Sequence, residues 1–214
     1  MDTNKLKLTF LLLVAAVPIS LATWVFGIRE EQGVSSTTNK GELVIPVIDI
    51  TLLSLRDEQG QPVYVAFEER VSNIEVKDYE PRPWQLLYLG AAECDATCEE
   101  RLYFLRQMHK RLNAEAKRVE RVYVQVDDTV TQLPEVTLKL LAEQQNDMKV
   151  VYATLDSLQE VLAPTVPANT DPASLHYIYV VDPLGNVMMY FTPENTPDEM
   201  LDDIDKLLDR SSIG

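Results

Sequence analysis

Two cysteines separated by three residues are the part of this sequence best suited to chemistry. Cys94 and Cys98 are the only cysteines among the 214 residues, in the run Cys-Asp-Ala-Thr-Cys. Thr97 and Glu100 have the spacing of a capping box, which predicts a helix that begins at Cys98 and places Cys94 in the loop before it. Residues one helical turn apart lie within about 6 Å, which a disulfide can span. So short a loop gains little stability from a bridge, which favours a chemical role over a structural one.

Two opposing influences act on these thiols. The free N–H groups at a helix N-terminus favour a thiolate. Four acidic residues surround the pair and oppose a thiolate by like-charge repulsion, namely Glu93, Asp95, Glu99 and Glu100. Acidic surroundings suit a site that holds a cation, and Cu(I) prefers soft thiolate ligands. Two interpretations therefore stay open at this point: a pair that handles thiols or Cu(I), and an inert or structural disulfide.

The elements that must position the cysteines alternate between strands and helices. A buried strand at 84–89 leads to them, and the helix that follows has an apolar stripe at Leu102, Leu105, Met108, Leu112 and Ala116. The remaining expected elements are extended segments at 44–55 and 63–66, strands at 119–126, 149–153, 176–181 and 187–191, helices at 134–144 and 154–162, and a last helix after the capping box at 196–199. This order, a βαβ half followed by a ββα half, predicts an α/β protein with a thioredoxin-like fold.

The sequence has two histidines, and one of them could join the cysteines. His176 begins the strand before the Asp182–Asn186 turn, and in a thioredoxin-like sheet the loop that precedes this strand faces the cysteine turn. His176 could therefore be the third ligand of a copper site with Cys94 and Cys98. The alternative is a strand-end histidine in contact with solvent. His109 lies more than two turns beyond Cys98, which is typical of a boundary residue rather than a ligand.

The N-terminal part has the pattern of a membrane span. Residues 8–28 form an uncharged run of 21 residues, which as a helix is about 30 Å long, the thickness of a hydrocarbon core. Lys5 and Lys7 precede it, which favours an N-terminus inside and a C-terminal domain outside. The alternative is a cleaved signal peptide, because Ser20-Leu21-Ala22 offers small residues at the required places. Both interpretations place the domain outside the cytoplasm, which in a bacterium is the periplasm, where cysteines can be oxidised.

We therefore expect a membrane anchor at 1–28, a polar linker at 29–42 and a thioredoxin-like domain at 43–214. The chain carries 34 acidic and 19 basic residues, a net charge of −15. So acidic a protein repels phosphate backbones, which excludes nucleic acid as an expected partner, although it could attract a basic protein or a cation. We expect three acids of the last helix, Asp202, Asp203 and Asp205, to lie on its polar side.

Three features together carry a resemblance to a known family. They are the anchor, the WQLLYLG strand that leads to Cys94-x-x-x-Cys98, and the YIYVVDPLGN segment. With them the chain resembles the SCO/SenC proteins, membrane-anchored thioredoxin-like factors of cytochrome c oxidase assembly, from about Asn39 to Leu208. It is more similar still to small thioredoxin-like membrane proteins found beside bacterial cytochrome oxidase genes. These share the start at Asn39–Leu43 and the run at Cys94–Tyr103.

The resemblance implies that both cysteines and a histidine bind Cu(I), and that copper or electrons are delivered to the copper-A centre of the oxidase. The two cysteines match the family motif directly. Glu99 stands where the SCO motif has a proline. The family's histidine position, counted back from Asp182-Pro183, falls on Ser174, and His176 is two residues further, displaced by about 6.6 Å along the strand.

From these features we expect an accessory factor for cytochrome c oxidase assembly, held in the inner membrane with its C-terminal domain in the periplasm. It would handle copper or thiols through Cys94 and Cys98. Its partner would be an oxidase subunit or another assembly factor, and its enzymatic activity would be at most that of a thiol–disulfide oxidoreductase. One alternative is a non-catalytic, membrane-tethered interaction protein with a structural disulfide. Another is a general thiol–disulfide oxidoreductase, which the three-residue spacing and the acidic surroundings favour less.

Overall fold

A computed structural model describes residues 14, 16–20, 38–72, 81–91, 93–126 and 133–211. Its contacts divide the chain into two units, residues 1–38 and 39–214. Most of the expected anchor at 8–28 and linker at 29–42 lies outside the described residues. Within the described ranges, no helix combines the length and the apolar character needed to cross a bilayer. The membrane anchor therefore stays a prediction, and the fold below is that of the second unit.

A six-stranded mixed sheet forms the centre of this unit, in the order β1-β6-β5-β2-β3-β4. Its strands are β1 (Glu42–Asp49), β2 (Trp84–Gly90), β3 (Val119–Val126), β4 (Lys149–Ala153), β5 (Ile178–Val181) and β6 (Asn186–Phe191). The strands β2, β3 and β4 run parallel, whereas β5 is antiparallel to β2 and β6, and β6 is antiparallel to β1. A parallel βαβ half followed by an antiparallel hairpin and a helix is the predicted thioredoxin-like arrangement.

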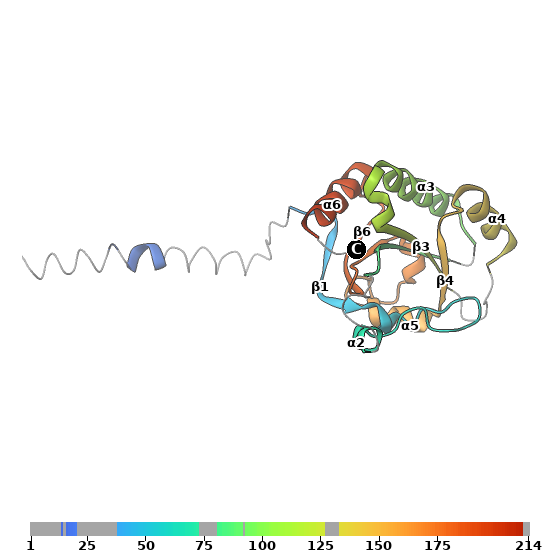
Figure 1. The fold of residues 1–214 in the computed structure, drawn as a ribbon, viewed down its shortest axis with the longest axis horizontal. Helices are drawn as coiled ribbons and strands as arrows, with labels where there is room; N and C mark the ends of the chain where they lie inside the picture. The colour runs from blue at the N-terminus through green and yellow to red at the C-terminus, as the bar shows by residue number, and fades with distance from the viewer. Residues whose placement is uncertain are drawn as a thin grey trace, which may run out of the picture. The chain divides into compact units, whose positions relative to one another are not determined.

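Helices cover both faces of the sheet (Figure 1). They are α2 (Phe67–Val71), α3 (Ala96–Arg111), α4 (Glu135–Gln144), α5 (Leu155–Leu162) and α6 (Pro197–Arg210), with 3-10 helices η1 (Ile50–Leu53), η3 (Asn113–Arg118) and η4 (Pro172–Leu175). The side of α3 and α6 holds a core that includes Leu86, Tyr88 and Cys98. The side of α5 and η1 holds a second core that includes Leu87 and Leu89. Strand β2 is thus buried on both faces, as its continuous apolar run predicts.

The expected strand at 63–66 is wrong. Only an isolated bridge from Arg56 to Pro62 forms there. The preceding turn is closed by the Asp57 carboxylate, which accepts hydrogen bonds from the backbone N–H groups of Gln59 and Gln61 at 2.9 and 2.8 Å. Pro62 has no N–H to donate to a neighbouring strand, so a regular ladder cannot start there.

The expected exposure of Asp203 is also wrong, because this side chain is 1% exposed. Its Oδ2 accepts hydrogen bonds from the backbone N–H groups of Lys40 at 2.5 Å and Gly41 at 2.9 Å, and its Oδ1 accepts one from Lys206 at 3.2 Å. Asp203 is three residues after Met200, which is itself fully buried, so it shares the inner side of α6. The carboxylate therefore fixes the segment that enters β1 against the last helix.

Candidate functional site

The two cysteines lie in the turn that joins β2 to α3. Asp95 is the N-cap of α3, and its Oδ1 accepts a hydrogen bond from the backbone N–H of Cys98 at 2.8 Å. The predicted capping box at Thr97 is therefore wrong: the helix begins at Ala96, because the nearby carboxylate of Asp95 offers a charged acceptor to the free N–H groups. Cys98 is consequently the third helical residue, and Cys94 immediately precedes the cap.

Cys94 and Cys98 form a disulfide, with their Cα atoms 5.2 Å apart, close to the separation expected from the sequence. The two sulfur atoms differ in their surroundings. Cys98 is 2% exposed and belongs to the core beneath α3, whereas Cys94 is half-buried and packs against that core. The backbone N–H of Cys94 donates to Thr137 Oγ1 of α4 at 3.4 Å, which anchors the turn. Cys94 is therefore the sulfur that an incoming thiol can reach.

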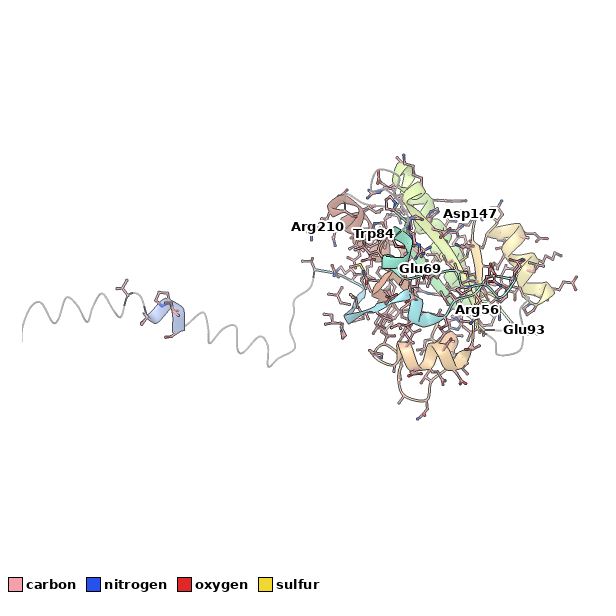
Figure 2. The ribbon with its side chains drawn as sticks, turned by 60° about the horizontal axis from the view of Figure 1, so that its bottom comes forward. Arg56, Glu69, Trp84, Glu93, Asp147 and Arg210 are labelled. Atoms are coloured by element: carbon pink, nitrogen blue, oxygen red, sulfur yellow. A yellow bond between two sulfur atoms is a disulfide. The ribbon has the colours of Figure 1, made fainter. Side chains whose placement is uncertain are left out.

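The acidic residues around the pair all lie at the surface, although the Asp95 carboxylate also caps α3. Glu93, Asp95, Glu99 and Glu100 are exposed, and Figure 2 shows Glu93 at the edge of the domain. They form an acidic rim around the half-buried sulfur of Cys94. This rim opposes a small anionic thiol and favours a basic surface on a protein partner.

His176 lies at the same end of the sheet as the cysteines. Strand β5 is antiparallel to β2, with Ile178 opposite Tyr88, so the residues before β5 lie beside the carboxyl end of β2. His176 itself ends η4 with a positive φ of 53°, and β5 therefore begins two residues later than the sequence predicts. Its half-buried ring is stacked on that of Tyr88 at a centroid distance of 6.3 Å.

Tyr88 connects His176 to the core below the cysteines. Its Oη lies 2.8 Å from Nδ1 of His176, within hydrogen-bond distance. Tyr88 is fully buried in the same core as Cys98. Burial raises the pKa of the Tyr88 hydroxyl far above its ordinary value, and Tyr123 and Asp95 raise it further, so the phenol stays protonated. The buried strand predicted at 84–89 gave no sign of this contact, because the contact depends on the pairing of β2 with β5.

The predicted copper ligands are not assembled in this structure. Both sulfur atoms are joined in the disulfide, and Nδ1 of His176 is engaged with Tyr88. Among the described residues, no group of three or more His, Cys, Asp and Glu side chains is close enough to hold a metal ion. The residues thus do not fit Cu(I) in the disulfide form. The assignment of Cys94, Cys98 and His176 as metal ligands stays a prediction for the reduced form.

His109 has a structural environment and is half-buried, as expected for a boundary residue at the edge of the apolar stripe of the helix. Its Nε2 lies 3.0 Å from the backbone oxygen of Ala116 and 2.8 Å from that of Val119. The ring therefore joins the end of α3 to the start of β3, away from the cysteine turn.

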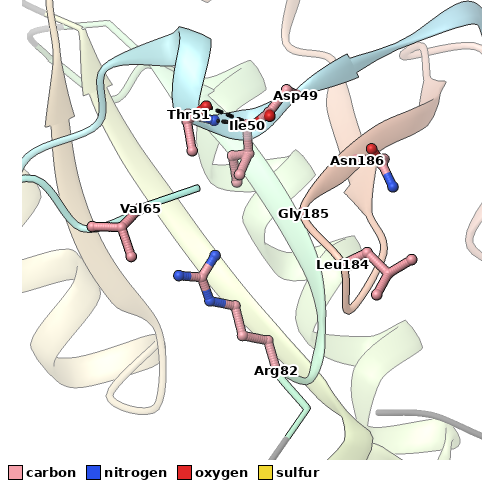
Figure 3. A pocket seen from close by; sticks show the side chains of 8 residues that line it. All are labelled: Asp49, Ile50, Thr51, Val65, Arg82, Leu184, Gly185 and Asn186. Atoms are coloured by element: carbon pink, nitrogen blue, oxygen red, sulfur yellow. Dashed lines mark hydrogen bonds between the residues drawn. The ribbon is translucent and has the colours of Figure 1, made fainter. Parts of the chain in front are cut away.

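Two of the hollows in the described part of the chain lie at opposite ends of the sheet. One, of about 380 Å³, is lined by residues 174–177, which include His176, and by residues 192–194. The other, of about 210 Å³, is drawn in Figure 3, where the Arg82 side chain extends toward it from below and Asp49 holds Thr51 at its rim. It includes Gly185 of the β5–β6 turn, which lies beside the start of β2. The second hollow is therefore remote from the disulfide, and the first is the one at the cysteine end.

Comparison with known families identifies the family of this domain. Residues 84–211 match the family described as the transmembrane-like, thioredoxin-like, C-terminal domain. The chain belongs to this family. The match runs from the first residue of β2 to the end of α6, so the thioredoxin-like family domain contains both cysteines and His176. No curated protein matches the sequence.

Solved Sco proteins are among the structural neighbours of this family member. Copper-bound ScoI of Arabidopsis thaliana is 16% identical, with 74% of this chain and 97% of that one covered and a TM-score of 0.51. Apo Sco1 of Thermus thermophilus is 16% identical, with coverages of 81% and 99% and a TM-score of 0.53. BsSco, a Sco-family cytochrome c oxidase assembly protein with a disulfide switch, is 15% identical, with coverages of 78% and 96% and a TM-score of 0.50. Likeness at this level shows a shared fold.

Proposed function

We propose that this protein is a membrane-anchored accessory factor for cytochrome c oxidase assembly that works by thiol–disulfide exchange on the periplasmic side of the inner membrane. One observation carries the chemical part of the proposal. A half-buried Cys94 is bonded to a fully buried Cys98 at the N-terminus of α3, so that the bridge has one accessible and one protected sulfur.

The exchange step follows from this asymmetry. A thiolate of a dithiol partner attacks Sγ of Cys94, a mixed disulfide forms, and the electron pair of the broken bond passes to Sγ of Cys98. The second thiol of the partner then displaces Cys94, which leaves as a thiolate and takes up a proton. The partner loses two electrons and becomes a disulfide, and the domain becomes a dithiol. In the reverse sequence the domain dithiol reduces a disulfide of the partner and the Cys94–Cys98 bridge forms again.

The oxidase as target is supported by the shared fold with BsSco, a member of a family of oxidase assembly proteins. The apolar segment at 8–28 supports an anchor that would keep the domain at the membrane surface where oxidase subunits are found. The acidic rim around Cys94 supports a partner with a basic surface, either an oxidase subunit or another assembly factor.

Delivery of copper is the second candidate function. The observation that favours it is the position of His176, held by Tyr88 at the cysteine end of the sheet, so that only its Nε2 is left for a ligand. The neighbour from Arabidopsis thaliana was solved with copper bound. Copper would then be a cargo, taken up after reduction of the disulfide frees the two thiolates.

A single set of strains tests both candidates. The variant with Cys94→Ser and Cys98→Ser should lower oxidase assembly to the level of a strain that lacks the protein, whereas His176→Ala should retain assembly if thiol exchange is the task. Assembled oxidase is measured by its haem spectrum and activity in membranes, with the amount of anchored protein measured alongside. Loss in both variants would favour copper delivery. Normal assembly in the double serine variant would overturn the proposal and indicate an interaction protein with a structural disulfide.

A further inference from the structure

Arg101 is a buried cation three residues after Cys98 on α3, with no hydrogen-bond partner among the described residues. The side chain is 2% exposed and lies on the inner face of α3 with Cys98 and Leu102. Its three guanidinium nitrogens are buried, and none has a hydrogen-bond partner in the part of the chain that the structure describes. Burial lowers the pKa of this guanidinium from its ordinary value, while Tyr88 and Glu100 act in the opposite direction. A charge in such surroundings is costly for the folded protein unless some state of the molecule pairs it.

Arg121 shows how the same fold treats a buried arginine that is purely structural. It is 1% exposed on β3, next to the parallel strand β4. Its guanidinium donates to Gln145 and forms an ion pair with Asp147, whose position at the surface is labelled in Figure 2. The contrast indicates that the missing partner of Arg101 is not a general property of buried arginines in this domain.

Arg101 lies on the same buried face of α3 as Cys98. It is three residues after Cys98, and side chains with this spacing are neighbours on one helix face. Helical side chains lean toward the N-terminus of their helix, so Arg101 covers the turn that contains Cys98. Tyr88, which interacts electrostatically with both Arg101 and Asp95, packs in the same core as Cys98 and reaches this corner from β2.

We propose that the counter-ion of Arg101 is the Cys98 thiolate that forms when the disulfide is reduced. This inference rests on the proposed exchange function and names the positioning residue of that site. Reduction by a dithiol breaks the bridge and leaves the electron pair on Sγ of Cys98, inside the core. The guanidinium then has a partner, and two buried charges that would each be costly alone compensate each other.

The other ionisable groups near Arg101 do not supply the negative charge that would pair with its guanidinium. Tyr88 from β2 and Tyr123 from β3 are buried phenols whose pKa values are raised by burial, so both are neutral. His176 is engaged with Tyr88 across the end of the sheet. The acids of the rim, Glu93, Asp95, Glu99 and Glu100, are exposed, and although Glu100 acts on Arg101 electrostatically, none of them hydrogen-bonds to its guanidinium. Arg101 therefore explains how a thiolate can be released in acidic surroundings.

The test compares Arg101→Met with Arg121→Met in the full chain in detergent, equilibrated with dithiothreitol as the dithiol. Arg101→Met should shift the equilibrium toward the domain disulfide by about tenfold or more, equivalent to a potential lower by about 30 mV for this two-electron couple. Arg101→Lys should lie close to the native protein. Arg121→Met should be less stable to heat but unchanged in its equilibrium with dithiothreitol.

The pH profile separates a charge effect from a packing effect. In reduced Arg101→Met, the ultraviolet absorbance of the thiolate should develop at higher pH than in the native protein, and the disulfide form should be at least as stable to heat as the native one. An unchanged equilibrium and an unchanged thiolate profile would overturn the inference. If Arg101→Met does not fold, Arg101→Gln takes its place with the same two outcomes. These measurements need no oxidase, so they can fail or succeed independently of the assembly assay.

Discussion

Gly90→Ala should destabilise the domain strongly, by about 3 kcal/mol in the free energy of unfolding. A Cβ atom at Gly90, the last residue of β2, would lie 2.0 Å from Oη and 2.2 Å from Cζ of Tyr123. Tyr123 is fully buried, so its ring has no free space into which it could move. Because Gly90 precedes the cysteine loop, the same change should also displace Cys94. Thermal and urea unfolding of the full chain measure the effect.

Tyr123→Leu provides the matched control. Leucine lacks the outer ring atoms that the new Cβ would strike, so the double variant Gly90→Ala with Tyr123→Leu should lose less stability than the sum of the two single changes. Strict additivity, or a Gly90→Ala protein that unfolds at the native temperature, would show that the close packing of β2 against β3 does not fix the cysteine loop.

Cys98→Ser should trap a mixed disulfide at Cys94. The remaining thiol is the half-buried one, and it has lost the buried sulfur that would resolve the intermediate. Incubation of the full-length variant with oxidised glutathione should therefore give nearly complete addition of one glutathione, detected by mass spectrometry. Cys94→Ser should react more slowly by a factor of about ten or more, because its remaining thiol is that of Cys98 in the core.

The order of these two rates is the critical outcome. Equal rates, or faster addition to Cys94→Ser, would mean that Cys98 is the accessible sulfur and that the proposed direction of attack is wrong. A denatured sample of each variant serves as control, since both thiols should then react alike.

The features predicted correctly from the sequence are those fixed by short-range patterns. The strand at 119–126 and the capping box at Thr196 are confirmed, because alternation and cap spacing are local properties. The start of α3 was misplaced by two residues, since Asp95 and Thr97 are both good caps and only the folded turn decides between them.

The parts of the site that the sequence could not reveal depend on distant contacts. The Cys94–Cys98 distance follows from one helical turn, but the bond between Tyr88 and His176 requires that β5 pair with β2. Arg101 left a weaker signal. Arg101 is three residues after Cys98 and four before Leu105, so it occupies a core position on the helix. Arginine is unusual at such a position.

The equilibrium of the native chain with glutathione is the most direct measurement of the central claim, that Cys94–Cys98 is a reversible working bridge. The full protein in detergent is equilibrated in buffers of stepped glutathione ratio, alkylated and weighed by mass spectrometry. Structural disulfides in secreted proteins have potentials below about −300 mV and resist glutathione. A reversible bridge predicts that the dithiol and disulfide forms coexist within the glutathione range. A bridge that stays fully oxidised throughout that range would contradict the claim and leave a structural disulfide in its place.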